Sequence, residues 1–270
     1  MQSILFKILH RQNKFRNPTD LVAIPSNFSY SVAEYHAAEN YLDELVRRGV
    51  RWTYPGHSFY PTAFYKMKEP PLFLEFQGDP FWMTEVFISV VGSRQISTLT
   101  ESWLKQHLGR FLKTLGVGVV SGGALGVDQL AHDIALKEQR LTVFVLPSGL
   151  GRLYPKSLSE YWTQMASGRL AFLSEFEYQS PLHKSYFFHR NRLIAALGEV
   201  TLVAQASLKS GSLLTVHHCL QNGRPVLTVP SHPQILGFEG NLKLARDGAY
   251  LVSSADDLLD FWKAEMWSRF

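Results

Sequence analysis

The segment GVGVVSGGALGVDQLAHDIA, residues 116–135, predicts a strand, a glycine turn and a helix in direct succession. The valines indicate a buried strand, because β-branched residues favour the pleated backbone. Apolar residues then recur at the three-and-four spacing of a helix face, at Val127, Leu130, Ala131, Ile134 and Ala135. A strand that turns directly into a helix is typical of α/β proteins, in which such units follow one another.

The same alternation continues on both sides of this segment. Further strands are expected at residues 86–92, 141–147, 170–175, 200–205 and 225–230, and helical patterns separate most of them, including one over 98–115. Strands that alternate with helices form a parallel sheet covered on both faces. We therefore expect an α/β fold with a Rossmann-like, doubly wound, mostly parallel sheet over residues 81–270, regular from about 84 to 265.

Residues 1–80 are expected to form a smaller and less regular N-terminal region. A helical pattern runs from Val32 to Arg48, and a short strand is expected at 72–76 after several proline and glycine turn signals. The first sixteen residues carry Lys7, Arg11, Lys14 and Arg16 and no acid. They predict a frayed basic arm or a short amphipathic helix, and they lack the features of a signal peptide.

The composition of the 270-residue chain is that of a globular protein, with 46% hydrophobic and 19% charged residues. Its formal net charge of +4 is unevenly distributed, because residues 180–225 hold five basic side chains against Glu199. This segment favours an anionic partner. A single cysteine excludes an internal disulfide framework, and no apolar run approaches the roughly 18 residues of a membrane span. We expect a cytoplasmic protein that does not bind a membrane.

Glycine- and serine-rich turns follow the strands at the carboxyl edge of the predicted sheet, where ligands bind in this architecture. Glycines allow close approach of the backbone, and N–H groups at a helix start favour an anion. The turns comprise Gly92, Ser93 and Arg94; Ser121, Gly122, Gly123 and Ala124; the stretch ending at Lys156; and Ser210, Gly211 and Ser212. Their convergence on one edge predicts an anion site.

Arg190 and Arg192 form a second basic cluster, directly after the aromatic residues 186–188. Guanidinium groups suit bidentate phosphate contacts, and near a helix start both can reach a shared groove. The aromatic residues either stack on bases in a nucleic-acid groove or belong to the core, and the sequence leaves both alternatives open. Lys184 and Phe187 are additional candidate contacts for nucleic acid.

The sequence indicates no catalytic residue, metal or cofactor. Asp128 is expected to hydrogen-bond the glycine turn from the first turn of its helix, since a carboxylate would repel a phosphate. His217 and His218 face different ways on a helix and have no second ligand motif nearby. Glu175 is a lone acid after a strand and is expected to order loops.

Taken in order, VGSR, SGGALGVD, SGLGRLYPK, LSE, RNRLIAAL, SGSLLT, GRPVLTVP and GFEGNLKLARDGA resemble the DNA-processing protein A family, DprA/Smf, over roughly residues 35 to 262. The resemblance implies a protein that binds single-stranded DNA, protects incoming strands in natural transformation and helps to load the recombinase RecA. It also implies a homodimer and a protein that is not an enzyme.

The resemblance further implies which residues contact the DNA phosphates. These are Gly92, Ser93, Arg94, Ser121, Gly122, Gly123, Ala124, Lys156, Arg190 and Arg192, while Ser210, Gly211 and Ser212 match the family pattern with a less defined role. The chain departs from the family at residues 230–233, where PSHP replaces the usual proline and glycine. No winged-helix-like extension is expected after Trp262, and the N-terminal region is divergent.

Two enzyme classes with related folds are alternatives. A Rossmann-like nucleotide-binding enzyme of the phosphoribohydrolase type would carry PGGxGTxxE, which this chain lacks. A nicotinamide-dependent dehydrogenase would carry GxGxxG after the first strand with an acid about 20 residues later. This chain has VGSR there instead.

Overall fold

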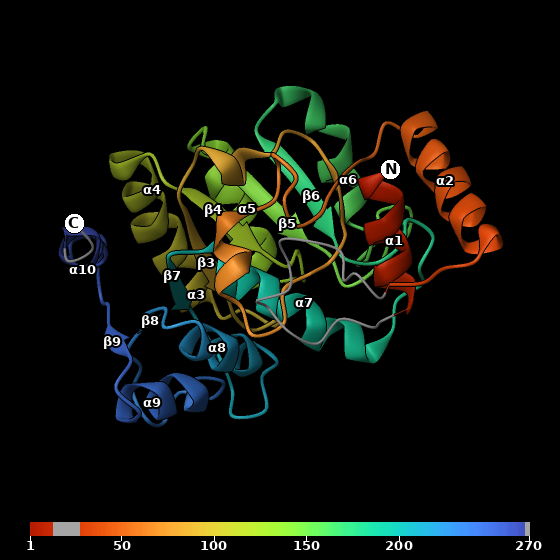
Figure 1. The fold of residues 1–270 in the computed structure, drawn as a ribbon. Helices are drawn as coiled ribbons and strands as arrows, with labels where there is room; N and C mark the ends of the chain where they lie inside the picture. Colours follow the sequence, from red (N-terminus) through yellow and green to blue (C-terminus); the bar gives the residue numbers. More distant parts are fainter. Residues whose placement is uncertain (13–27, 268–270) are drawn as a thin grey trace.

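The computed structural model describes residues 1–12 and 28–267, which are built around a nine-stranded sheet (Figure 1). The strands are β1 Arg51–Thr53, β2 Leu74–Gln77, β3 Phe87–Val91, β4 Gly118–Ser121, β5 Thr142–Val145, β6 Leu170–Ser174, β7 Val200–Val203, β8 Val226–Thr228 and β9 Tyr250–Leu251. Their spatial order is β1-β2-β6-β5-β4-β3-β7-β8-β9. All pairs from β6 to β9 are parallel, whereas β1 and β2 join the sheet antiparallel. The predicted doubly wound, mostly parallel sheet is confirmed.

The strand order reverses at β3. The chain places β4, β5 and β6 successively on one side of β3 and then returns to place β7 on its other side. Ser89 in β3 pairs with Val120 of β4 and with Thr201 of β7. Because the connections after β3 and β7 leave the sheet in different directions, a crevice opens between the carboxyl ends of these two strands.

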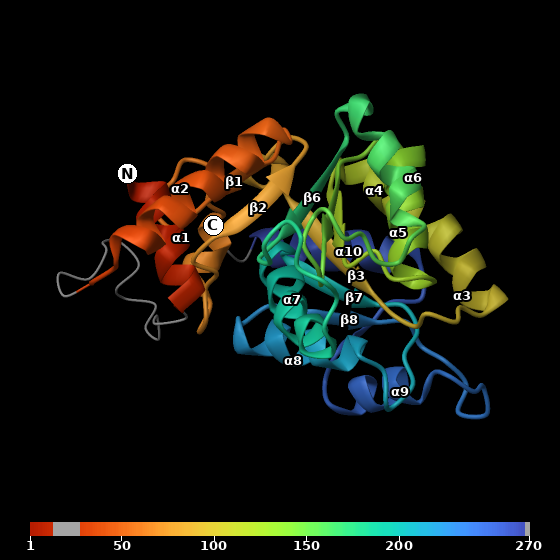
Figure 2. The same ribbon diagram turned by 90° about the vertical axis from the view of Figure 1, so that its right-hand side faces the viewer.

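Helices cover both faces of the sheet (Figure 2). One face packs against α3 Thr98–Trp103, α4 Gly109–Leu115, α5 Val127–Lys137 and α10 Ala255–Trp267. The other packs against α7 Lys184–Leu197, α8 Ser212–Gln221 and α9 Glu239–Arg246. A π-helical turn, Leu104–Leu108, joins α3 to α4, so the expected helix over 98–115 is continuous but not uniformly α-helical.

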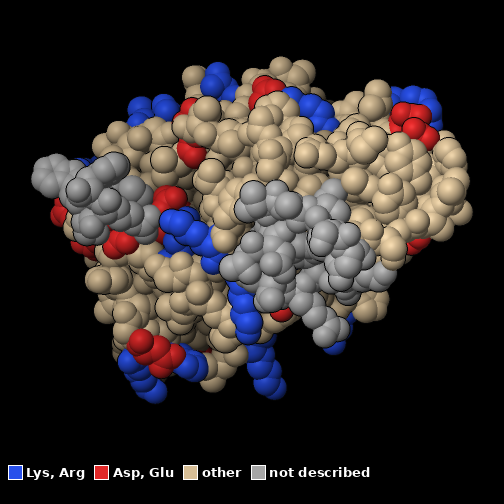
Figure 3. All heavy atoms as spheres, in the orientation of Figure 1, with Lys and Arg blue, Asp and Glu red and all other residues tan. Residues whose placement is uncertain are grey.

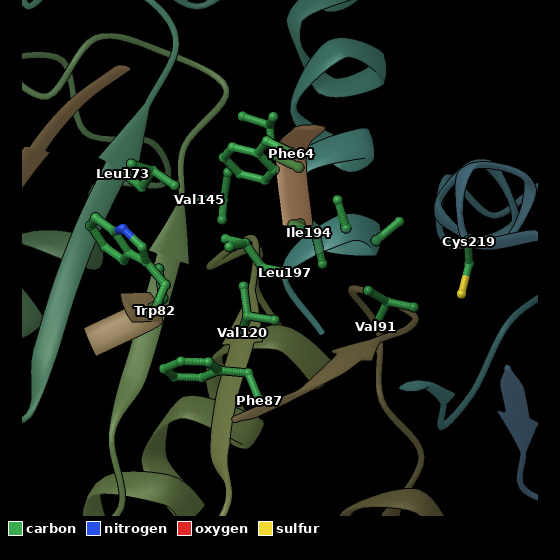
Figure 4. Packing of buried hydrophobic residues seen from close by; sticks show 14 of the residues in the cluster. Phe64, Trp82, Phe87, Val91, Val120, Val145, Leu173, Ile194, Leu197 and Cys219 are labelled. Atoms are coloured by element: carbon green, nitrogen blue, oxygen red, sulfur yellow. The ribbon is translucent and has the colours of Figure 1, made fainter. Parts of the chain in front are cut away.

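Alternation along the strands assigns side chains to the two faces. In β3, Ile88 and Val90 join the cluster under α4 and α5, whereas Phe87 and Val91 join the cluster under α7. Figure 4 shows Ile194 and Leu197 of α7 directed at Val120 and Val145 of the central strands. This packing fixes the position of α7 over the sheet, and α7 carries both arginines of the predicted basic cluster.

The described part of residues 1–80 extends the same sheet. β1 and β2 add to β6, and the helices α1 Gln2–Gln12 and α2 Val32–Arg47 pack with α6 Leu158–Thr163 on that end of the molecule. The basic start of the chain forms α1, in which Lys7 is buried within 3.3 Å of Glu75. The expected Lys14 and Arg16 of the basic arm lie outside the described residues.

Charge is unevenly distributed over the surface. On the face shown in Figure 3, a row of Lys and Arg side chains runs down the middle to the lower edge, further basic side chains lie along the upper edge, and acidic side chains are scattered. Among the described residues, no helix is both long enough and apolar enough to span a lipid bilayer.

Candidate anion-binding site

A cavity of about 300 Å³ lies at the reversal of strand order, between the carboxyl ends of β3 and β7 and under the first half of α7. The residues lining it include Gly92, Ser93, Arg94, Ala124, Asp128, Phe187, Arg190, Asn191, Ser210, Gly211 and Ser212. We call it the main cavity. It brings together the predicted turns after β3, β4 and β7 and one arginine of the predicted cluster.

The loops after β3 and β7 are bonded to each other. The Ser93 N–H donates to the carbonyl of Gln205 at 2.7 Å, and the Ser212 hydroxyl donates to the carbonyl of Gly92 at 2.9 Å. The Ser93 hydroxyl donates to the Gln95 carbonyl. These serines therefore build a rigid rim around the main cavity, and several of their donors are already used in doing so.

The glycine turn after β4 holds a carboxylate. The N–H groups of Gly122 and Ala124 donate to Oδ2 of Asp128 at 3.2 and 3.4 Å. The expected bonding of Asp128 to this turn is confirmed. The two amides are consequently not free to donate to a bound anion, so the turn contributes to the site chiefly by seating Asp128 and by leaving room for Arg190.

Gly122 leaves that room because it has no side chain. A Cβ at this position would lie 1.5 Å from Nη1 of Arg190. The Arg190 guanidinium passes through the space and donates to the carbonyl of Val145 at 2.8 Å. Burial lowers the pKa of Arg190 to about 10, against the attraction of Asp128, so the group is still a cation at pH 7.

Arg94 and Arg190 approach the same aromatic ring. The guanidinium carbon of Arg94 lies 5.2 Å from the Phe187 ring centre, and that of Arg190 lies 6.0 Å from it. Beyond this ring is a smaller cavity of about 60 Å³, lined by both arginines, Phe187, Gly122, Ala124, Leu125, Pro147, Tyr154 and Pro155. We call it the side cavity. The site thus combines two cations with an adjacent, mainly apolar recess.

Five predicted contacts do not line either cavity: Ser121, Gly123, Lys156, Lys184 and Arg192. The Ser121 hydroxyl is buried and donates to the carbonyl of Val90. A Cβ at Gly123 would face Leu158 of α6. Lys156 is exposed beside the side cavity, next to Pro155, and Lys184 is exposed at the start of α7. The replaced loop at residues 230–233 also lines neither cavity.

Arg192 faces away from the main cavity. Its Nη2 lies 2.6 Å from both carboxylate oxygens of Glu175, and the two side chains are 10% and 12% exposed. The expected structural role of Glu175 therefore involves this ion pair. Arg192 lines a separate small cavity with Phe188 and His218. Side chains two positions apart on an α-helix point in directions about 200° apart around the helix axis. Arg190 and Arg192 therefore cannot share one groove.

The three aromatic residues of α7 lie outside the buried core. Phe187 lines both cavities, Phe188 is 44% exposed against His218, and Tyr186 stacks on Phe176 at 3.8 Å. Of the two alternatives left open by the sequence, the geometry favours a surface role for Phe187.

Asn191 and Gln205 are among the residues of the site that were not recognised in the sequence. Asn191 lines the main cavity and donates to the Gly211 carbonyl at 3.4 Å. Gln205, at the end of β7, accepts hydrogen bonds from Ser97 and Thr100 and so ties the helix α3 to the rim. Both adjoin recognised motifs, and a polar residue at the end of a buried strand was the available signal for Gln205.

Comparison with known proteins identifies relatives along most of the chain. The family model for DNA recombination-mediator protein A matches residues 51–263. Protein Smf of Escherichia coli (strain K12) is 32% identical over 206 residues, which are 75% of this chain and 54% of that protein. DprA of Bacillus subtilis (strain 168) is 31% identical over 202 residues, 74% of this chain and 67% of its own length.

Solved structures show the same fold. DprA of Streptococcus pneumoniae has a TM-score of 0.75 and 25% identity, with 96% of this chain and 93% of that one covered. DprA of Helicobacter pylori, whose structure is described in terms of its single-stranded DNA binding mode, has a TM-score of 0.70 and 28% identity, with 80% and 97% covered. The chain spans only about half the length of the Smf relatives. Because the matched residues include the whole reversal of strand order and its loops, this chain belongs to the DNA recombination-mediator protein A family.

Proposed function

We propose that this protein binds single-stranded DNA and holds a backbone phosphate in the main cavity between Arg94 and Arg190. The observation that carries this proposal is the pair of guanidinium groups that meet at Phe187, at the reversal of strand order. Guanidinium groups are strong donors to phosphate, and a desolvated one interacts more strongly than one in bulk water. The Ser210–Ser212 turn supplies the opposite wall.

The side cavity favours a single strand over a duplex. Phe187, Tyr154, Pro147 and Pro155 offer apolar surface next to the phosphate position, on which an unpaired base can stack. A base in a duplex is not accessible in this way. We infer that Lys156, which is exposed and follows Pro155 of the side cavity, contacts the next phosphate. Contacts of this kind read the backbone and carry little sequence preference.

The relatives support this proposal and extend it. The Helicobacter pylori protein is described as binding single-stranded DNA, and the chain is similar to it over most of both lengths. From the resemblance to the DprA/Smf family we further infer that the protein protects incoming strands and assists RecA loading. Purified protein that retains no RecA in a pull-down, with single-stranded DNA present, would count against the RecA contact.

The site is better suited to binding than to catalysis. Asp128 is the acid among the described residues lining the main cavity. Its Oδ2 already accepts hydrogen bonds from the backbone N–H groups of Gly122 and Ala124. A general base must reach its substrate with an available lone pair, and its pKa must lie near the working pH. We therefore infer that the protein acts on DNA by holding it.

Replacing Arg94 by alanine is expected to weaken binding of a fluorescent oligothymidine about tenfold, since a hydrogen bond to a charged group contributes roughly 1.5–3 kcal/mol. The slope of log K against log salt should fall by about 0.7, the value for one lost phosphate contact on a single strand. Fluorescence anisotropy across a salt series, with the matching duplex in parallel, measures both. The fold is expected to be unaffected because Arg94 is exposed.

The matched control is Arg47→Ala, an exposed arginine on α2 that lines neither cavity. It should change the affinity by less than about twofold, because distant surface charges are screened. Equal affinities and salt slopes for the wild type and Arg94→Ala would place the phosphate elsewhere. No binding to either DNA form at low salt would remove the DNA-binding proposal altogether.

We also infer a homodimer, formed through the later half of the sheet. The edge strand β9 exposes Tyr250 and Leu251, at 57% and 56%, and Leu220 of α8 is 64% exposed. Between these elements lies a largely apolar cavity of about 360 Å³.

Light scattering at micromolar concentration should give twice the mass of one chain. The variant Leu251→Arg should give the mass of a single chain, because burying an unpaired charge in the dimer interface is unfavourable.

A further inference from the structure

Asp128 places a carboxylate among the residues that line the proposed phosphate site. The residue is 6% exposed and forms part of the main cavity with Arg94 and Arg190. It sits on the first turn of α5 and binds the turn after β4 through its Oδ2. Binding the turn accounts for its hydrogen bonds but not for its position beside two cations in a cavity suited to an anion.

The charges that face this carboxylate come from several elements. Arg190 approaches from α7 and attracts the carboxylate, and Arg94, from the loop after β3, lines the same cavity. The Ser121 hydroxyl of β4 bonds the carboxylate, and the imidazole of His132 lies one turn further along α5; neither adds a net charge. Burial holds the pKa of His132 well below its ordinary value, so this imidazole is neutral. Among the described residues lining the main cavity, two guanidinium groups and one carboxylate leave a formal charge of +1.

We propose that Asp128 is the residue that matches the main cavity to a singly charged phosphodiester and discriminates against a doubly charged phosphomonoester. This inference rests on the proposed DNA binding and concerns the same site. A phosphodiester within a strand carries one negative charge and balances the cavity. A phosphomonoester, as on a strand end or a free nucleotide, carries up to two negative charges at pH 8 and is repelled more strongly by the carboxylate.

The same arrangement couples binding to a proton. Burial already raises the pKa of Asp128, and an anion in the cavity raises it further because it disfavours the ionised carboxylate. Anion binding is therefore accompanied by proton uptake at pH values between the pKa of Asp128 in the free protein and its pKa in the complex. Affinity rises as the pH falls through that window and is level above it.

The test compares the wild type with Asp128→Asn, whose side-chain oxygen can still accept the bonds from Gly122 and Ala124. At pH 8, we expect the variant to bind an oligothymidine without terminal phosphates about tenfold more tightly and thymidine 5′-monophosphate about 100-fold more tightly, roughly tenfold per unit of ligand charge. The ratio of the affinity for the oligothymidine to the affinity for thymidine 5′-monophosphate should therefore be about tenfold smaller in the variant than in the wild type. Anisotropy measures the first ligand, and competition measures the second.

Asp133→Asn is the matched control, since Asp133 is an exposed carboxylate on the same helix and outside the main cavity. It should leave the preference unchanged. The pH profiles of wild type and Asp128→Asn are compared between pH 5 and 8, so that histidine protonation, which also favours DNA at low pH, cancels between them. The wild-type profile should be the steeper one.

Calorimetry of the wild type gives an independent result if Asp128→Asn does not fold. Titration with the oligothymidine in two buffers of different ionisation enthalpy counts the protons taken up. At a pH where the wild-type affinity changes, we expect a net uptake that persists after allowance for histidine. An unchanged preference with parallel pH profiles, or zero proton uptake, would overturn the role of Asp128 while leaving DNA binding intact. A wild type that binds no oligothymidine would instead refute the proposed function.

Discussion

Replacing Arg192 by methionine is expected to lower the free energy of unfolding by about 3–5 kcal/mol, the cost of removing one partner of a buried ion pair. Glu175 would keep its burial and lose the cation 2.6 Å away. The affinity of the folded variant for single-stranded DNA, and its salt dependence, should be unchanged within about twofold, because Arg192 lines neither cavity of the proposed site. Denaturant unfolding and anisotropy measure the two quantities.

The double variant Arg192→Met/Glu175→Gln distinguishes the loss of stability caused by an unpaired buried charge from the loss caused by the changed shape of residue 192. It should recover part of the lost stability, since no uncompensated charge is then buried. A salt slope that falls by about 0.7 in Arg192→Met, as one phosphate contact requires, would show that this arginine reaches DNA after all. In that case α7 must rotate or the ion pair must open on binding.

Replacing Gly122 by alanine is expected to weaken binding of single-stranded DNA about 30- to 100-fold. The new Cβ would lie 1.5, 2.2 and 2.5 Å from Nη1, Cζ and Nη2 of Arg190, so the guanidinium must leave its position. It would lose its bond to the Val145 carbonyl, and the folded state would lose about 1–2 kcal/mol with it. The larger effect falls on affinity, because a partly desolvated cation is removed from the phosphate site.

Gly109→Ala is the matched control. This glycine lies within the helix α4, away from both cavities, and the atom nearest to a Cβ at this position would be 3.6 Å from it, an ordinary contact. The substitution should leave DNA affinity unchanged and raise stability by about 0.5–1 kcal/mol, since glycine is unfavourable in a helix. If Gly122→Ala binds DNA as the wild type does, Arg190 does not contact the phosphate.

Much of the fold followed from the sequence. Periodicity placed the strands of residues 86–230 and the helices between them, because the spacing of apolar residues reflects which face of each element is buried. Two local features were also predicted: the turns at the carboxyl ends of the strands, and the bonds from the Gly122 turn to Asp128, only six residues away. Such short-range bonds depend mainly on neighbouring residues and are therefore readable from sequence.

The tertiary structure alone decided which of the turn residues and arginines reach the cavity. The sequence gives no reason to distinguish Arg190 from Arg192. The packing of Ile194 and Leu197 on the central strands sets the rotation of α7 about its axis. This rotation directs Arg190 into the site and Arg192 toward Glu175. The tertiary structure likewise turned Ser121 inward and joined β2 to β6 across about 100 residues. The direction of a side chain depends on how whole elements pack, and no local pattern encodes that rotation.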